Sequence, residues 1–171
     1  QTLTNKTLTA PKINENVAVT STATELNLLD GKAATNLALL GKTEGTNFTD
    51  SLLVGHATTG TLNDAKENTG VGINALESIT SGDRNTAIGN LSGAVINSGT
   101  DNTSVGYGSN RYLTTGTKNT AIGKNTLQQN ISGQRNIGIG YHSGTNILGD
   151  GNVIIGGVDA DSATGDRQLK I

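Results

Sequence analysis

The sequence predicts an all-β chain that folds as a parallel β-solenoid of about seven coils, with about 17 residues in each coil. Three observations support this prediction. A five-residue motif of the type NTAIG recurs at a fixed interval, which indicates stacked structural units. The 171 residues include 24 Gly but no Cys, Met or Trp, and only 2% are aromatic, so bulky side chains for a thick core are missing. Two glycine columns divide each repeat, as the two corners of a coil would.

The Asn that opens each motif recurs with a strict period. It occupies positions 68, 85, 102, 119 and 136 at equal intervals, and the last interval, which ends at position 152, is shorter by one residue. The segment SLLVG, residues 51–55, continues the register backwards with Ser in the place of Asn, which makes seven copies. The opening Asn and the closing Gly define the structural repeat, and these residues are Asn68, Gly72, Asn85, Gly89, Asn102, Gly106, Asn119, Gly123, Asn136, Gly140, Asn152 and Gly156.

The middle positions of the motif predict how the strand is oriented. The fourth position is always Val or Ile, which favours a buried strand position, so we expect this column to point inward. The second position, where Thr exchanges with Leu, Ile and Val, shares that face and should be buried or half-buried. The third position is mostly small, as in Gly70, Ala87 and Ser104, and predicts close approach of another surface, for example a neighbouring chain.

Glycine marks both predicted corners of the coil. The closing Gly indicates a positive φ or a corner without room for a Cβ atom. A second column of Gly indicates the opposite corner, so we expect two short strands per coil; its residues are Gly82, Gly99, Gly116, Gly133 and Gly149. The Asn column follows this second corner, where Asn side chains of successive coils can hydrogen-bond along the stack.

The segments outside the repeat domain, residues 51–157, have different patterns. Residues 1–50 are predicted to be an N-terminal shaft or connector: residues 1–13 alternate like a strand, and residues 22–30 predict a short helix that ends at Gly31. Residues 158–171 are predicted to be a polar connector that leads into a strand, and we expect this end to be truncated.

The thin core predicts self-association. At about 4.8 Å per coil, seven coils form a rod about 35 Å long. Each coil supplies only a few inward side chains, too few for an isolated rod. We therefore expect a homotrimeric fibre, with chains either intertwined or side by side.

No catalytic, cofactor-binding or metal-binding residues are predicted. The chain has two His, His56 and His142, expected to be ordinary surface residues, and neither an HExxH motif nor a P-loop. The net charge of −2 gives no footprint for nucleic acid, and no 18-residue apolar run predicts membrane insertion. A depolymerase with a carboxylate pair between chains is the weaker alternative, because sugar-cleaving grooves usually also contain aromatic platforms.

One outward column is a candidate for receptor contact. The residue after the closing Gly is Tyr107, Lys124 and Tyr141 in three successive coils. Tyr and Lys on a rigid face can stack on and hydrogen-bond a glycan. The alternative is that these Tyr side chains only cover their neighbours on the β surface.

The order of several motifs resembles a known class of proteins. "LTNKTLTAPKI", "TATELNLLDG", serial "NTAIG" copies and "GDRQLKI" together resemble tail-fibre proteins of marine and cyanobacterial bacteriophages, over nearly the whole chain. The resemblance implies a homotrimeric segment of a virion tail fibre, which contacts other tail components and attaches to a host-surface glycan or protein.

Two further interpretations compete with the fibre. The repeat is also similar to the head repeats of trimeric autotransporter adhesins, which have a shorter period and occur at the bacterial cell surface, where such a head would bind glycans or proteins. An ice-binding solenoid is a third interpretation, based on the Thr column. It is disfavoured because each coil has one such Thr, and Leu52, Ile137 and Val153 replace it in other coils.

Overall fold

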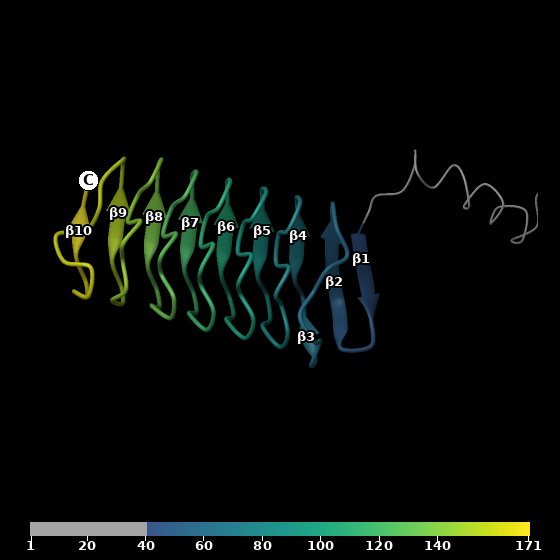
Figure 1. The fold of residues 1–171 in the computed structure, drawn as a ribbon. Helices are drawn as coiled ribbons and strands as arrows, with labels where there is room; N and C mark the ends of the chain where they lie inside the picture. The colour runs from purple at the N-terminus through teal and green to yellow at the C-terminus, as the bar shows by residue number, and fades with distance from the viewer. Residues whose placement is uncertain (1–40) are drawn as a thin grey trace, which may run out of the picture. The chain divides into compact units, whose positions relative to one another are not determined.

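The computed structural model describes residues 41–171, so the predicted strand of residues 1–13 and the predicted helix of residues 22–30 lie outside it. This part of the chain is composed of strands, turns and bends, with no helix. The strands stack side by side along one axis, and from β4 onward each is joined to the next by a loop on the same side (Figure 1). The prediction of an all-β parallel solenoid is confirmed for these residues.

One ten-stranded sheet runs along the whole stack. It begins with an antiparallel pair, β1 (Gly41–Gly45) and β2 (Phe48–Val54), and the short β3 (Ala65–Lys66) pairs with the start of β2. The other strands follow one per coil and are parallel to one another: β4 (Thr69–Val71), β5 (Thr86–Ile88), β6 (Thr103–Val105), β7 (Thr120–Ile122), β8 (Ile137–Ile139), β9 (Val153–Ile155) and β10 (Leu169–Lys170). Each pair of neighbouring strands aligns the same motif positions of two successive coils.

The prediction of two strands per coil is wrong from β4 onward. Each of these coils has one strand, and the rest of the coil consists of turns. The turns nevertheless stack through backbone hydrogen bonds, such as Leu76 N to Ser92 O at 3.2 Å and Ser78 N to Ala94 O at 3.1 Å. Positive φ angles recur here, 59° at Asn74 and 57° at Leu76, and they interrupt the extended path that a second strand would need.

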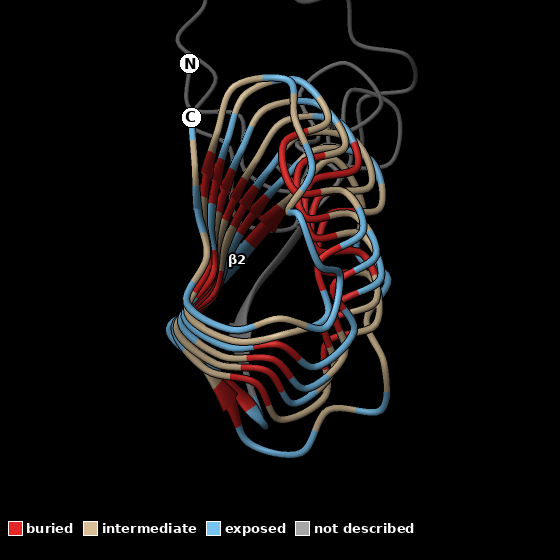
Figure 2. Ribbon diagram, turned by 90° about the vertical axis from the view of Figure 1, so that its left-hand side faces the viewer, coloured by how far each residue is buried: buried red, intermediate tan, exposed pale blue. Residues whose placement is uncertain are grey.

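The predicted orientation of the strand is also wrong. The third motif position points inward, and the second and fourth positions point outward. Leu53 and Ala87 are 0% exposed, whereas Ile88 and Ile122 are 43% and 40% exposed. Figure 2 looks along the stack, with the strands on one side of the coil and the turns on the other. The small third-position residues therefore line the interior and do not meet a neighbouring chain.

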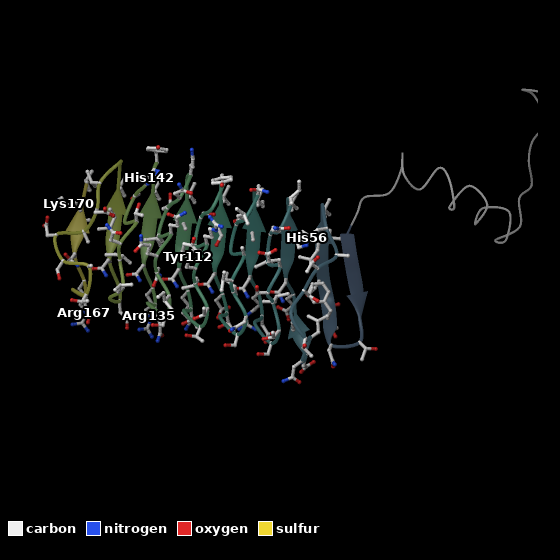
Figure 3. All side chains as sticks on the ribbon, viewed as in Figure 1. His56, Tyr112, Arg135, His142, Arg167 and Lys170 are labelled. Carbon is white, nitrogen blue, oxygen red and sulfur yellow. The ribbon has the colours of Figure 1, made fainter. Side chains whose placement is uncertain are left out.

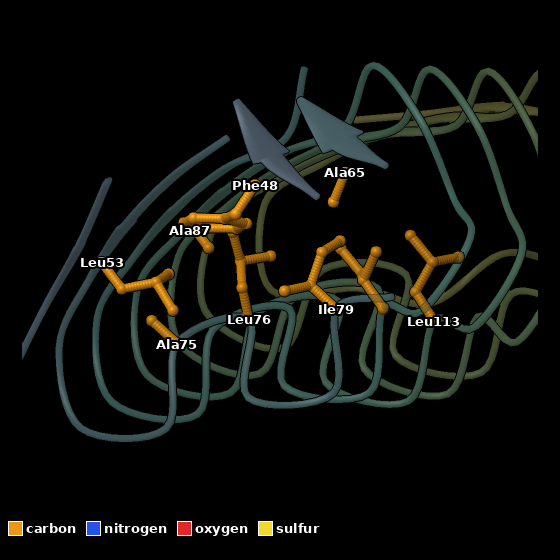
Figure 4. Packing of buried hydrophobic residues seen from close by; sticks show 9 residues of the cluster. Phe48, Leu53, Ala65, Ala75, Leu76, Ile79, Ala87 and Leu113 are labelled. Carbon is orange, nitrogen blue, oxygen red and sulfur yellow. The ribbon is translucent and has the colours of Figure 1, made fainter. Parts of the chain in front are cut away.

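The narrow interior explains this orientation. The first apolar cluster consists of Phe48, Leu53, Ala65, Ala75, Leu76, Ile79, Ala87, Ile96 and Leu113 (Figure 4). Most of its large side chains come from the turns, including Leu76 and Ile79, and they reach across to the strands. A Cβ atom at Gly70, on β4, would already collide with Leu53. Small third-position residues fit in this space, and the Val and Ile of the fourth position are left on the outside.

The coil that contains β6 has buried polar side chains in its interior. Ser92 Oγ lies 3.0 Å from Ser109 Oγ, and Asn110 Nδ2 donates to Ser104 Oγ at 2.8 Å. Asn110 Oδ1 is buried and has no hydrogen-bond partner. An unpaired buried acceptor is destabilising, so this coil is a weak point in the stack.

We expect the double variant Ser104→Ala/Asn110→Leu to be at least as stable as the parent. The next coil already has Ala121 and Leu127 at these two positions. The substitution removes both partners of one hydrogen bond together with the unpaired Oδ1, so no polar atom of that pair is left without a partner. Leu127 adopts a φ of 48°, which shows that Leu accepts the 47° found at Asn110.

Urea unfolding would measure the effect of this double variant. The single variant Ser104→Ala should lose about 1 to 2 kcal/mol, because it leaves Asn110 Nδ2 buried without an acceptor. A double variant that is less stable than this single variant would contradict the conclusion that the Ser104–Asn110 pair is a weak point of the stack.

The buried Asn residues form the predicted ladder. Asn102 Oδ1 accepts hydrogen bonds from the backbone N of Asn119 at 2.9 Å and from its Nδ2 at 3.1 Å. Asn102 Nδ2 donates to Asn85 Oδ1 at 3.0 Å and to Gly116 O at 2.9 Å. One side chain thus closes its own coil and binds the coils before and after it, and this confirms the predicted role of the Asn column.

Gln168 extends the ladder beyond the predicted repeat domain. Its N and Nε2 atoms donate to Asn152 Oδ1 at 2.9 and 3.1 Å, and β10 then pairs with β9 in parallel. Residues 158–171, predicted to be a connector, therefore complete a further coil. The sequence did contain a signal for this further coil. The segment GDRQLKI at residues 165–171 has the same length as GDRNTAI at residues 82–88 and begins with the same three residues.

The two glycine corners differ in backbone conformation, but at both of them the backbones of stacked coils approach closely. The closing Gly has a positive φ in every coil, 124° at Gly106, and a Cβ atom at Gly106 would lie 2.6 Å from Gly123 O, so both reasons given for this corner are confirmed. The second column has no positive φ at Gly116; instead, a Cβ atom there would lie 2.5 Å from Gly133 O in the next coil. The second corner therefore needs Gly because the backbones of stacked coils approach closely.

Candidate functional site

The outward strand positions form a continuous face without charge. We call it the Thr/Ile face, and its residues are Leu52, Val54, Thr69, Val71, Thr86, Ile88, Thr103, Val105, Thr120, Ile122, Ile137, Ile139, Val153 and Ile155. All are exposed or half-buried. At about 4.8 Å per coil, the face is roughly 30 Å long. An exposed strip of apolar and methyl-bearing side chains of this length is typical of an interaction surface.

The structure brings the three predicted receptor-contact residues together. We call Tyr107, Lys124 and Tyr141 the Tyr/Lys ridge. Lys124 Nζ lies 5.8 Å from the ring centroid of Tyr107 and 5.7 Å from that of Tyr141. Tyr107 is 45% exposed and Tyr141 is 62% exposed. The ammonium group therefore sits between two aromatic rings in cation–π geometry, at the surface.

Three polar side chains beside the ridge were not predicted. Gln128 Nε2 donates to Asn125 Oδ1 at 3.2 Å, and Asn125 Nδ2 lies 3.3 Å from His142 Nε2. The ring of His142 meets that of Tyr141 edge-on, with centroids 4.2 Å apart. The only sequence signal was position, since Asn125 and His142 directly follow ridge residues.

The ridge and the charged corner, which we define by Lys66, Asp83, Arg84 and Asp101, lie at opposite ends of the strands. Figure 3 shows His142 at one end of its strand and Arg135 and Arg167 at the other. His142 directly follows Tyr141 in the chain, so the ridge belongs to the first of these ends.

The other predicted surface histidine, His56, has a local structural role. His56 Nε2 lies 2.7 Å from Ala75 O, and the backbone N of Thr58 donates to His56 Nδ1 at 3.1 Å. Both ring nitrogens are therefore engaged within the first coils. This histidine supports a turn and leaves no free nitrogen for chemistry.

Carboxylates at the charged corner hold the coils together. Asp83 Oδ1 accepts a hydrogen bond from Lys66 N at 2.9 Å. Arg84 Nε donates to Asp101 Oδ1 at 2.6 Å, and this hydrogen bond lowers the pKa of Asp101. Asp101 is therefore a carboxylate at neutral pH and is engaged in an ion pair, an environment unlike that of a general acid.

Other kinds of site find no support in the described residues. Among the described side chains, those of residues 46–171, no three His, Asp or Glu are grouped so that they could hold a metal ion. Over the same range, no helix has the length and apolar character needed to cross a bilayer. Protein-family models, curated proteins and solved structures provide no match to this chain.

Proposed function

We propose that this chain is a segment of a homotrimeric bacteriophage tail fibre that contributes to host attachment and performs no catalysis. The observation that carries the proposal is the Thr/Ile face, which runs along the stack without a single charged residue. A rod of stacked coils provides reach, and a continuous face along its length suits lateral association. The partners in this proposal are two further copies, other virion tail components, and a glycan or protein of the host surface.

The Thr/Ile face alone is smaller than a standard interface, so a trimer must also bury the residues that border it. At roughly 30 Å by 10 Å, two columns of side chains supply about 300 Å² per copy. A standard two-protein interface buries about 800 Å² per partner. Closing three rods around one axis lets each copy bury this face and its borders against two neighbours at once. Because the coils repeat at one spacing, a second copy offers the same ladder of side chains in register.

A bacterial trimeric adhesin head is the alternative, favoured by the similarity of the NTAIG repeats to adhesin heads. It would have the same solenoid and the same trimer, at the bacterial cell surface. The flanking gene sequence separates the two proposals. An adhesin gene would encode a signal peptide and a membrane anchor, whereas a fibre gene would lie among virion tail genes.

The proposed trimer predicts a specific mass in solution and a substitution that should dissociate it. Light scattering of the parent should give about three times 17.4 kDa. Ile122→Lys, in the middle of the Thr/Ile face, should shift the mass towards one chain, because three ammonium groups would meet near the axis. Like charges placed opposite one another at an interface are strongly unfavourable.

Ile131→Lys is the matched control for this variant. Ile131 is 52% exposed but lies in the turns, outside the Thr/Ile face. It should keep the parent mass. A parent that stays monomeric at micromolar concentration, or equal disruption by the two variants, would refute the proposed interface.

A further inference from the structure

We propose that the Tyr/Lys ridge binds a saccharide that bears a carboxylate, with Lys124 as the anion contact and Tyr107 and Tyr141 as stacking surfaces. This inference deepens the attachment role proposed above and rests on it. It assigns the chemical class of the receptor at one surface of the rod.

The ammonium group of Lys124 is available to an anionic ligand. The ion pairs of the described residues involve Lys66, Arg84 and Lys170, and Lys124 is in none of them. Its ammonium group instead lies against the two Tyr rings. Rings attract the cation but do not accept all three of its N–H donors, so a carboxylate can still form charge-assisted hydrogen bonds with it.

The corner that carries Lys124 has no acidic residue in the described coils. In the seven coils, the two positions after the closing Gly hold His56, Ala57, Ile73, Asn74, Asn90, Leu91, Tyr107, Gly108, Lys124, Asn125, Tyr141, His142, Gly157 and Val158. Lys124 is thus a lone positive charge among these positions, although the chain as a whole carries a net charge of −2. A polyanion attracted to this protein would therefore be attracted to a local site, since the overall charge repels it.

The ridge is held in place before any ligand arrives. Asn125 N donates to Tyr107 O at 2.8 Å, and His142 N donates to Lys124 O at 2.9 Å. These bonds fix the three coils relative to one another at the base of the ridge. The two Tyr are two coils apart, about 9.6 Å, so their rings can contact neighbouring parts of one sugar chain. A rigid site loses little conformational entropy on binding.

The neighbouring amides supply hydrogen bonds suited to sugar hydroxyl groups. Asn125 and Gln128 already bond to each other at 3.2 Å at the edge of the ridge. Such groups can donate to and accept from hydroxyl groups of a ligand without leaving a buried atom unpaired. Single sites of this kind bind weakly, and three copies in one fibre would strengthen attachment by avidity.

Affinity electrophoresis in gels that contain polygalacturonate tests this proposal, with dextran as the uncharged comparison. The parent should be retarded by polygalacturonate and much less by dextran. Lys124→Gln should weaken retardation about tenfold, the size expected for loss of one charge-assisted contact. Tyr107→Ala/Tyr141→Ala should weaken binding by a similar factor, and retardation should fall as salt rises.

The third Tyr of the chain also lies close to a cation, elsewhere on the surface, and this pair provides the control. Arg111 Cζ lies 5.2 Å from the ring centroid of Tyr112, which lies in the turns between the two corners. Arg111→Gln/Tyr112→Ala should leave retardation unchanged, provided that all variants melt like the parent. Equal weakening by ridge and control variants, or no retardation of the parent, would overturn the proposal.

Light scattering of the same samples separates this inference from the proposed function. A trimeric parent without retardation would reject the ridge and leave the fibre standing. A monomeric parent whose retardation depends on Lys124 would refute the trimer but support saccharide binding by the Tyr/Lys ridge.

Discussion

Gly106→Ala should lower the free energy of unfolding by about 2 to 6 kcal/mol, a loss large enough to threaten the whole stack. Gly106 has a φ of 124°, and holding a non-Gly residue in such a region costs about 1 to 3 kcal/mol. The new Cβ atom would also lie 2.6 Å from Gly123 O and 2.7 Å from Gly123 C. Relief of that overlap requires neighbouring coils to separate, which costs about 1 to 3 kcal/mol more. Urea unfolding at matched protomer concentration measures the sum.

Gly156→Ala separates the two contributions to this loss. Gly156 occupies the same motif position with a φ of 107°, yet a Cβ atom there would meet nothing within 4 Å. It should lose only the backbone part, about 1 to 3 kcal/mol. Equal losses in the two variants would show that contact between successive coils contributes nothing at this corner.

Asn102→Leu should lower the free energy of unfolding by about 2 to 6 kcal/mol. Leu has the same branched arrangement of four side-chain heavy atoms but makes none of the four hydrogen bonds of the Asn102 side chain, two to Asn119, one to Asn85 and one to Gly116. The backbone N of Asn119 and the carbonyl of Gly116 would be left without these partners in the interior. Each buried polar group without a partner costs about 1 to 3 kcal/mol.

Two further variants make this prediction specific to the ladder. Asn102→Ser should be intermediate, because Ser51 already accepts the backbone N of Asn68 through its Oγ at 2.8 Å. Asn125→Ala removes an Asn that is outside the ladder and should lose no more than about 2 kcal/mol, because Ala tolerates the φ of 55° at this position less well than Asn does. If Asn102→Leu unfolds at the same urea concentration as Asn125→Ala, the ladder is not a stabilising element.

The period of the repeat was sufficient to predict which residues lie side by side. Tyr107 and Lys124 are separated by one period, as are Lys124 and Tyr141, so a stack with that period must align them. The same reasoning predicted the Asn ladder and both glycine corners. Neighbours related by one period follow from the sequence because each coil repeats the backbone path of the coil before it.

Contacts that do not follow the period were missed. Gln128 bonds to Asn125 within one coil, through a turn whose conformation the repeat does not specify. Gln168 was missed because it replaces the Asn that marked every earlier coil. The second strand was predicted wrongly for a similar reason: Gly spacing located two corners, but the positive φ at Leu76 and at related residues made the other side a series of turns.

The sequence by itself determined the coil length, the parallel stacking and the residues that align from coil to coil. It also determined that the strand has two faces, since side chains alternate along any strand. Which face is inside was decided only by the tertiary structure. Leu76 and Ile79 reach inward from the turns and occupy much of a narrow interior, so the strand places only its third position there, and in most coils that residue is small. The Val and Ile that were expected to form the core therefore form the outer face of the rod, because the interior has no volume left for them.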